Sequence, residues 1–218
     1  MCRMQYKGAI FDMDGVLFDT ERIYQETWQE IAALQDITLD GSFLRAISGT
    51  NGAHMCRVIE KYYHVPDGKD IMERCMEQVR QKLSVYVPMK KGVRDILDYF
   101  RKNDIGIAVA SSSAVQQIEA NLQMSGIRDY FSVIVSGSEV NQGKPEPDIF
   151  LLAAKRLHCA PEECFVFEDS ENGIRAGYAA GCFTVMVPDL LEASSEIQPY
   201  CRKICSDLEQ AVREIIRM

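Results

Sequence analysis

The chain alternates short apolar runs with longer stretches in which apolar residues recur at every third or fourth position. The short runs are rich in β-branched and aromatic residues and end in polar residues or glycine, which is typical of buried parallel strands. The longer stretches have the period of amphipathic helices, as in Val93, Ile96, Leu97 and Phe100. This alternation predicts a parallel sheet with crossover helices. The predicted strands are residues 6–11, 105–110, 131–135, 164–167 and 183–187.

One segment, residues 19–87, contains only helical patterns. Apolar positions at helical spacing predict three helices in it, around residues 23–34, 55–62 and 72–83. Pro88 and Gly92 mark the return to alternating strands and helices. We therefore expect a Rossmann-like, doubly wound α/β core made of residues 1–18 and 88–218, with an all-helical domain, residues 19–87, inserted after the first strand.

The 24 Lys and Arg residues are outnumbered by 32 Asp and Glu residues, which gives a formal net charge of −8. This balance disfavours a nucleic-acid partner, because binding to polymeric phosphate requires a basic surface. No run approaches the roughly 18 apolar residues of a membrane span, and the first strand begins too early for a signal peptide. We therefore expect no membrane partner and a cytoplasmic location. The eight cysteines include no Cys-x-x-Cys pair, which favours reduced thiols.

Two carboxylates, Asp12 and Asp14, follow the first predicted strand at the edge of the sheet where open α/β folds bind ligands. Carboxylates about 4 Å apart repel by roughly 4 kcal/mol near a protein surface, so such a pair needs a cation or a shared proton. Oxygen ligands that leave room for phosphate suit Mg²⁺. A second acidic pair, Glu168 and Asp169, ends a later strand, and we expect at least one of the two to face the same edge. Taken alone, an Asp-x-Asp pair is equally typical of a solvated turn.

Two further motifs follow predicted strands. The run of Ser111, Ser112 and Ser113 offers hydroxyl and backbone N–H groups at the start of a helix, which suits a phosphate group, although an ordinary helix cap has the same sequence. Lys144 stands between Gly143 and Pro145, where the backbone is well defined, so that its ammonium can be directed at a ligand. A surface lysine is the alternative. A nucleotide P-loop is excluded, because proline replaces the Ser or Thr that this motif requires.

Together these motifs, in this order along the chain, resemble the haloacid dehalogenase superfamily. The Asp-Met-Asp-Gly run at residues 12–15 is similar to the first motif of that family, Ser111 to the second, Lys144 to the third, and the Glu-Asp pair at 168–169 to the fourth. The helical insert is similar to the family's α-helical cap. The runs GKPEPDIF at residues 143–150 and FEDSENGIRAG at residues 167–177 resemble the branch that contains beta-phosphoglucomutase and small sugar phosphate phosphatases.

The resemblance implies a mechanism. Asp12 is implied as the nucleophile that forms an aspartyl phosphate, and Asp14 as the acid and base that serves the leaving alcohol and the water. Mg²⁺ is implied on Asp12, the main-chain carbonyl of Asp14, and Asp169, with Glu168 bound directly or through water. Lys144, Ser111 and Ser112 would hold the phosphoryl oxygens.

Three positions favour a phosphatase over a mutase. The resemblance implies that mutases of this branch carry a histidine, an arginine and a lysine for a second phosphate, and the corresponding residues here are Tyr24, Gly52 and Ala114. We therefore expect a Mg²⁺-dependent phosphatase acting on a small phosphorylated metabolite, such as a sugar phosphate. Beta-phosphoglucomutase activity is the alternative, and a non-catalytic module that binds a phosphorylated metabolite is the alternative of another class.

Substrate specificity is expected to lie in the helical insert. Gly15 and Tyr24 are further candidates for substrate contact, although packing is equally compatible with Tyr24. Residues 49–54 are expected to select the alcohol that carries the phosphate. The resemblance also implies a monomer.

Overall fold

The computed structural model describes residues 6–47, 50, 52–189 and 192–217. The chain forms two compact units, one of residues Met1–Asp19 and Val87–Met218 and the other of residues Thr20–Tyr86. We call the first the core and the second the cap. Each unit is built around its own apolar interior, so each is described by itself.

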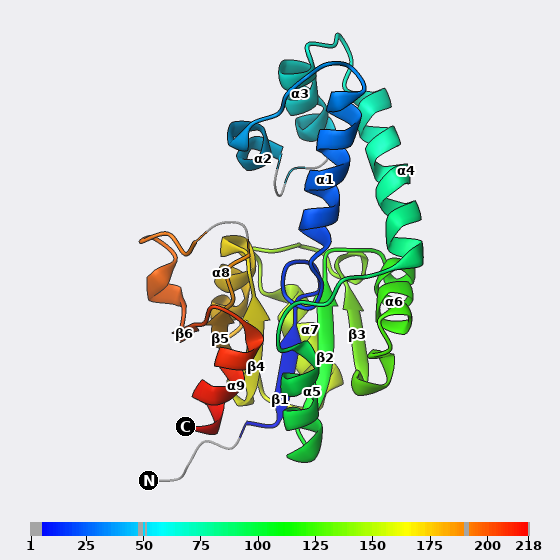
Figure 1. Ribbon diagram of the computed structural model, residues 1–218. Helices are drawn as coiled ribbons and strands as arrows, with labels where there is room; N and C mark the ends of the chain where they lie inside the picture. The colour runs from blue at the N-terminus through cyan, green and yellow to red at the C-terminus, as the bar shows by residue number, and fades with distance from the viewer. Residues whose placement is uncertain (1–5, 48–49, 51, 190–191, 218) are drawn as a thin grey trace. The chain divides into compact units, whose positions relative to one another are not determined.

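The core contains a six-stranded parallel sheet with strand order β3-β2-β1-β4-β5-β6 (Figure 1). This is the doubly wound α/β fold that the alternating pattern predicts. The five predicted strands are present with their ends shifted by one or two residues, whereas β6 was not predicted, because two residues carry no periodicity. The strands are β1 (Gly8–Phe11), β2 (Gly106–Ser111), β3 (Val133–Ser136), β4 (Cys164–Glu168), β5 (Phe183–Met186) and β6 (Lys203–Ile204).

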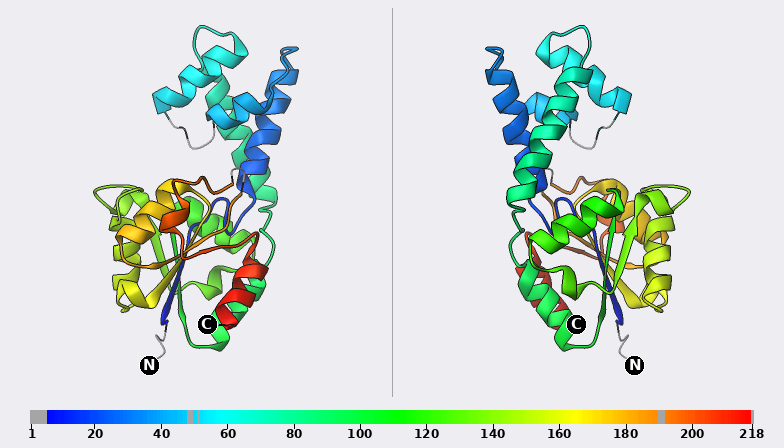
Figure 2. Two further views of the ribbon diagram at one scale, coloured as in Figure 1. Left: turned by 90° about the vertical axis from the view of Figure 1, so that its left-hand side faces the viewer. Right: turned by 90° about the vertical axis from the view of Figure 1, so that its right-hand side faces the viewer.

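Helices cover both faces of the sheet (Figure 2). Helices α5 and α9 pack against each other on one face, and α7 and α8 lie on the other. The helices of the core are α5 (Val93–Lys102), α6 (Val115–Met124), α7 (Asp148–Arg156), α8 (Glu171–Ala179) and α9 (Leu208–Ile216), with short 3-10 helices at Arg128–Tyr130, Gly137–Glu139, Pro161–Glu163 and Gln198–Tyr200. With both faces covered, the central strands are apolar throughout: every residue of β1 is buried.

The cap is helical, as predicted, but has one helix more than expected among its described residues. It comprises α1 (Thr20–Ala33), α2 (Gly41–Ile47), α3 (Gly52–Tyr63) and α4 (Lys69–Val85). Helix α2 was not predicted, because seven residues span only two turns and show little periodicity. Its Phe43 ring packs against Trp28 and Tyr63, with centroids 6.0 and 5.9 Å apart. Trp28 is therefore part of the interior of the cap.

The two segments that connect the units run side by side within the core. The backbone N–H of Asp19 donates to the carbonyl of Pro88, and that of Lys90 donates to the carbonyl of Leu17, both at 2.9 Å. These hydrogen bonds hold the two connecting segments together just beyond the carboxyl end of β1.

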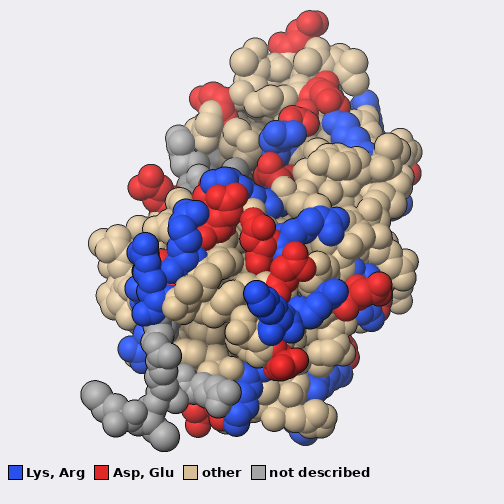
Figure 3. Space-filling view, turned by 60° about the horizontal axis from the view of Figure 1, so that its bottom comes forward, with Lys and Arg blue, Asp and Glu red and all other residues tan. Residues whose placement is uncertain are grey.

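Charged side chains of both signs are interspersed over the face shown in Figure 3, where basic and acidic residues alternate. In the described part of the chain, we find no helix whose length and apolar character would allow it to cross a lipid bilayer.

Candidate active site

Strand register brings the acidic motifs to one edge of the sheet. Phe11 of β1 pairs with Val109 of β2 and with Phe167 of β4. The pairing continues one residue further, because the backbone N–H of Asp12 donates to the carbonyl of Phe167 at 3.0 Å. Since parallel strands end at the same edge, the residues that follow these three strands lie close together.

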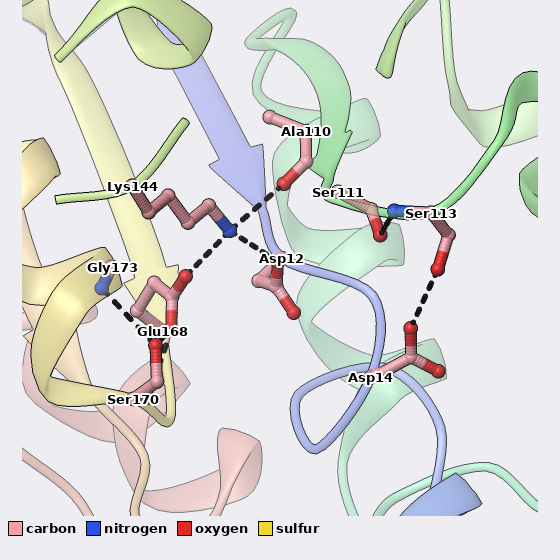
Figure 4. A network of polar contacts seen from close by, with 9 residues as sticks. All are labelled: Asp12, Asp14, Ala110, Ser111, Ser113, Lys144, Glu168, Ser170 and Gly173. Carbon is pink, nitrogen blue, oxygen red and sulfur yellow. Dashed lines mark hydrogen bonds and ion pairs between the residues drawn. The ribbon is translucent and has the colours of Figure 1, made fainter. Parts of the chain in front are cut away.

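Lys144 lies at the centre of this edge, and Figure 4 shows its side chain reaching between two carboxylates. Its ammonium forms an ion pair with Asp12, donates to Glu168 Oε1 at 2.6 Å, and donates to the carbonyl of Ala110 at 3.3 Å. All three donor positions of the ammonium are thus used. Only 8% of the Lys144 side chain is exposed, so this lysine is not a solvated surface residue.

The electrostatics of this cluster favour an additional cation. The pKa of Asp12 is raised from 3.8 to about 7, because burial and the negative charge of Glu168 outweigh the attraction of Lys144. Burial alone would lower the pKa of Lys144, but the two carboxylates outweigh it and raise that pKa above its ordinary value. The pKa of Asp169 is raised well above 3.8 by loss of solvation and by the charges of Glu168 and Asp12.

Both carboxylate oxygens of Glu168 are held by protein donors. Oε1 accepts from Lys144, and Oε2 accepts from the backbone N–H and the hydroxyl of Ser170, each at 2.9 Å. Gly173 on α8 makes room for this side chain, since a Cβ there would lie 1.8 Å from Glu168 Oε1. Glu168 therefore holds Lys144 in place and is itself held against the N-terminus of α8.

Asp169 lies against the loop that follows β1. Gly15 in that loop has a φ of +82°, and a Cβ on it would lie 2.3 Å from Asp169 Oδ2. A side chain at position 15 would therefore be strained and would also displace the carboxylate. The absence of a side chain at Gly15 lets Asp169 approach the main chain next to Asp14.

The serine loop contacts Asp14 through Ser113, which belongs to the predicted run of serines but was not one of the two serines assigned to the phosphate. Ser113 Oγ donates to Asp14 Oδ2 at 3.2 Å (Figure 4). The backbone N–H of Ser113 donates to the Oγ of Ser111 at 3.1 Å, which leaves the hydroxyl hydrogen of Ser111 for another acceptor. The sequence signal for Ser113 was its place in a run of three serines, but a run does not show which hydroxyl faces the carboxylate.

The structure brings together seven of the nine predicted site residues at one edge of the core sheet. Ser112 is exposed, and Tyr24 lies half-buried on α1 of the cap. The predicted specificity segment lies partly outside the described residues, at positions 49 and 51. The residues that meet at the core edge are Asp12, Asp14, Ser111, Lys144, Glu168 and Asp169, together with the loop at Gly15.

The chemistry of the donor groups fits a hard divalent cation. No group of three or more His, Cys, Asp or Glu side chains is arranged to hold a metal within the described ranges. The resemblance implies a cation held by the carboxylates of Asp12 and Asp169 and the main-chain carbonyl of Asp14, with Glu168 bound directly or through water. Burial and the neighbouring carboxylates raise the pKa of both carboxyl groups, and oxygen ligands of this kind suit Mg²⁺.

Comparison with known proteins identifies the family of this chain. Residues 9–187 match the family model described as haloacid dehalogenase-like hydrolase. The chain belongs to this family. This haloacid dehalogenase-like hydrolase is 32% identical over 176 residues to a phosphorylated carbohydrates phosphatase of Thermotoga maritima, an alignment that covers 80% of this chain and 82% of that protein.

A mutase is also among the relatives of this hydrolase. It is 32% identical over 189 residues to a beta-phosphoglucomutase of Bacillus subtilis, with 83% of each chain covered. Among solved structures, a hydrolase of the same family from Deinococcus radiodurans, crystallised with phosphate and sodium, superposes with a TM-score of 0.86 at 22% identity, covering 99% of this chain and 97% of that chain. The last similarity establishes the shared fold.

Proposed function

We propose that this hydrolase is a Mg²⁺-dependent phosphatase that cleaves a small phosphomonoester, such as a sugar phosphate, through an aspartyl-phosphate intermediate. The observation that carries the proposal is the buried Asp12 carboxylate, which is held by Lys144 at the same edge as Asp14, Ser111 and Asp169. A carboxylate of this kind is positioned and desolvated for attack on an electrophile.

In the first half of the proposed reaction, a carboxylate oxygen of Asp12 bonds to phosphorus. The bond from phosphorus to the alcohol oxygen breaks, and Asp14 gives that oxygen its proton. In the second half, the oxygen of a water bonds to phosphorus, the water proton passes to Asp14, and the bond from phosphorus to Asp12 breaks. Both side chains then return to their starting states, and phosphate leaves.

The other core residues hold charge in place during both halves. Lys144 compensates the negative charge of Asp12 and is directed by Glu168 and the carbonyl of Ala110. Ser111, oriented by accepting from a backbone N–H, offers its hydroxyl hydrogen to a phosphoryl oxygen. Ser112 remains a proposed phosphate contact through its exposed hydroxyl.

A divalent cation completes the proposed site. Asp12, Asp169 and the main-chain carbonyl of Asp14 would hold Mg²⁺. Glu168 would contribute directly or through water, since its Oε1 accepts only one bond from a protein donor. When bound, Mg²⁺ neutralises charge between the nucleophile and the phosphoryl oxygens.

A phosphatase is favoured over a mutase by the residues at the three second-phosphate positions. Ala114 precedes α6 and its side chain has no hydrogen-bond donor. Gly52 begins α3 with a φ of +50°, and a Cβ added there would have no neighbour within 4 Å. Neither residue can supply the positive charge that a second phosphate requires. Tyr24 carries a hydroxyl but no charge at neutral pH.

The test of the function is Mg²⁺-dependent release of inorganic phosphate from 4-nitrophenyl phosphate. We expect wild-type turnover, loss of turnover in Asp12→Asn, and unchanged turnover in Asp129→Asn, which alters an exposed acid of the core. Incubation with a hexose 1-phosphate and its bisphosphate separates the alternatives. Formation of isomerised sugar phosphate without free phosphate would establish a mutase. Binding of phosphorylated metabolites without release of phosphate from any ester would establish a binding module.

A further inference from the structure

The hydroxyl of Ser113 is directed at the carboxylate that transfers protons in the proposed reaction. Ser113 Oγ donates to Asp14 Oδ2 at 3.2 Å, and Figure 4 shows both side chains pointing toward each other. The inference drawn here rests on the proposed function. We propose that Ser113 is a positioning residue, which orients Asp14 so that its other oxygen, Oδ1, delivers the proton to the leaving alcohol.

The position of Ser113 is set by two neighbouring strands. Its carbonyl accepts a hydrogen bond from the hydroxyl of Ser136 at 2.7 Å, and its N–H donates to Ser111 Oγ at 3.1 Å. Ser136, at the end of β3, is fully buried, and its own N–H donates to Glu139 Oε1 at 2.9 Å. The backbone that carries the Ser113 hydroxyl is thus fixed from both sides.

Close backbone packing adds to this rigidity. A Cβ on Gly137 would lie 3.1 Å from the Cα of Ser112, so the turn after β3 presses directly against the serine loop. The conformational freedom of a hydroxyl on such a loop is small. The hydrogen bond to Asp14 therefore selects one orientation of the carboxylate at a small entropic cost.

The consequence for proton transfer follows from the two oxygens of Asp14. While Ser113 donates to Oδ2, the transferable proton resides on Oδ1. In the first half-reaction, the Asp12–phosphorus bond forms, the bond from phosphorus to the alcohol oxygen breaks, and that oxygen receives the proton from Oδ1. Asp14 is then a carboxylate that remains hydrogen-bonded to Ser113 and accepts a proton from water in the second half.

A different role for Ser113, direct contact with the phosphoryl group, makes a different prediction. A phosphate contact serves every phosphomonoester equally, because the phosphoryl group is the same in all of them. A residue that positions the general acid matters most for a basic leaving group, which needs the proton, and least for an acidic leaving group, which departs as an anion.

The experiment compares kcat/KM for phenyl phosphate and for 2,4-dinitrophenyl phosphate, with Mg²⁺ present. We expect Ser113→Ala to lower kcat/KM for phenyl phosphate about tenfold and for the dinitrophenyl ester by less than about twofold. Ser113→Thr keeps the hydroxyl and is expected to recover most of the phenyl phosphate activity. Ser132→Ala is the matched control, since it removes a hydroxyl that donates at 3.2 Å to Ile107, at the opposite end of the sheet.

The outcomes are distinguishable. Retained activity on the dinitrophenyl ester shows that Ser113→Ala is folded. An equal loss on both esters, or no loss on either, would overturn the positioning role while leaving the phosphatase intact. If the wild-type protein released phosphate from neither ester, the proposed function would fail, and the role of Ser113 with it.

Discussion

The Lys90 ammonium lies 2.5 Å from Asp189 Oδ1, although the two residues are 99 positions apart. Lys90 belongs to the segment that returns from the cap to the core, and it also lies 3.6 Å from the carboxylate of Asp19, on the outgoing segment. Asp189 follows β5 and is 7% exposed in its side chain. Lys90 thus links both segments that connect the core with the cap to the loop that follows β5.

We expect Lys90→Met to destabilise the core by about 2 kcal/mol, because it leaves the largely buried Asp189 carboxylate without its cation. The lysine itself is partly exposed, which reduces the effect below that of a fully buried pair. Lys91→Met is the control. Its ammonium is exposed and pairs with Asp207 and Glu209 at the surface, where solvent screens the charges, so we expect a much smaller change in stability than in Lys90→Met. Urea unfolding of both variants measures the difference, and equal losses would contradict the role assigned to Lys90.

We expect Lys144→Met to lower kcat about 10² to 10³-fold, because the variant removes the cation that compensates Asp12. Lys144→Arg is expected to recover little of this activity. The planar guanidinium is larger than the ammonium and must fit among Asp12, Glu168 and the Ala110 carbonyl. Steady-state kinetics on 4-nitrophenyl phosphate gives the comparison, and an active Lys144→Met enzyme would refute the proposed role of the lysine.

The stability of the metal-free protein is expected to fall as pH rises from about 4 to about 7. In this range the folded state keeps the proton on Asp12, whose pKa is raised to about 7, while the unfolded chain loses it near 3.8. The folded state then binds more protons, so the free energy of unfolding decreases with pH. Thermal unfolding in the presence of a chelator measures this slope, and Asp12→Asn should remove much of it.

Added Mg²⁺ should stabilise the protein more at pH 8 than at pH 5, because the metal and the proton compete for the same carboxylates. At a concentration 100 times its dissociation constant, a ligand specific to the folded state adds about 2.7 kcal/mol. The rise in Tm on adding MgCl2 at the two pH values tests this expectation. A rise that is equal at both values would argue against metal binding at Asp12 and Asp169.

Alanine substitutions at Gly15 and Gly181 distinguish the effect of backbone strain from the effect of displacing a site residue. Both have positive φ, +82° and +85°, but a Cβ on Gly15 meets Asp169, whereas a Cβ on Gly181 meets nothing within 4 Å. We expect either change to alanine to cost about 1 to 2 kcal/mol from the left-handed backbone. Only Gly15→Ala is expected to lose the Mg²⁺-dependent rise in Tm and the phosphatase activity. Loss of both in Gly181→Ala as well would show that strain alone accounts for the effect.

Much of the core could be predicted from local pattern. Buried strands leave a continuous apolar signal, and the polar residues that end them are expected at one edge, because parallel strands share a direction. Short elements escaped prediction: α2 and β6 are too brief for a period to emerge, and their place depends on packing. Phe43 of α2 illustrates this, since its buried position is created by Trp28 and Tyr63.

The sequence by itself determined the class of the fold and the chemical groups available at the carboxyl edge of the sheet, since both follow from periodicity and from the residues that end each strand. Tertiary structure decided which of those groups meet. It directed Ser113 rather than Ser112 toward Asp14, and it enclosed Lys144 between Asp12 and Glu168. The direction of a loop side chain depends on hydrogen bonds to neighbouring strands that are distant in sequence, and a local pattern contains no information about them.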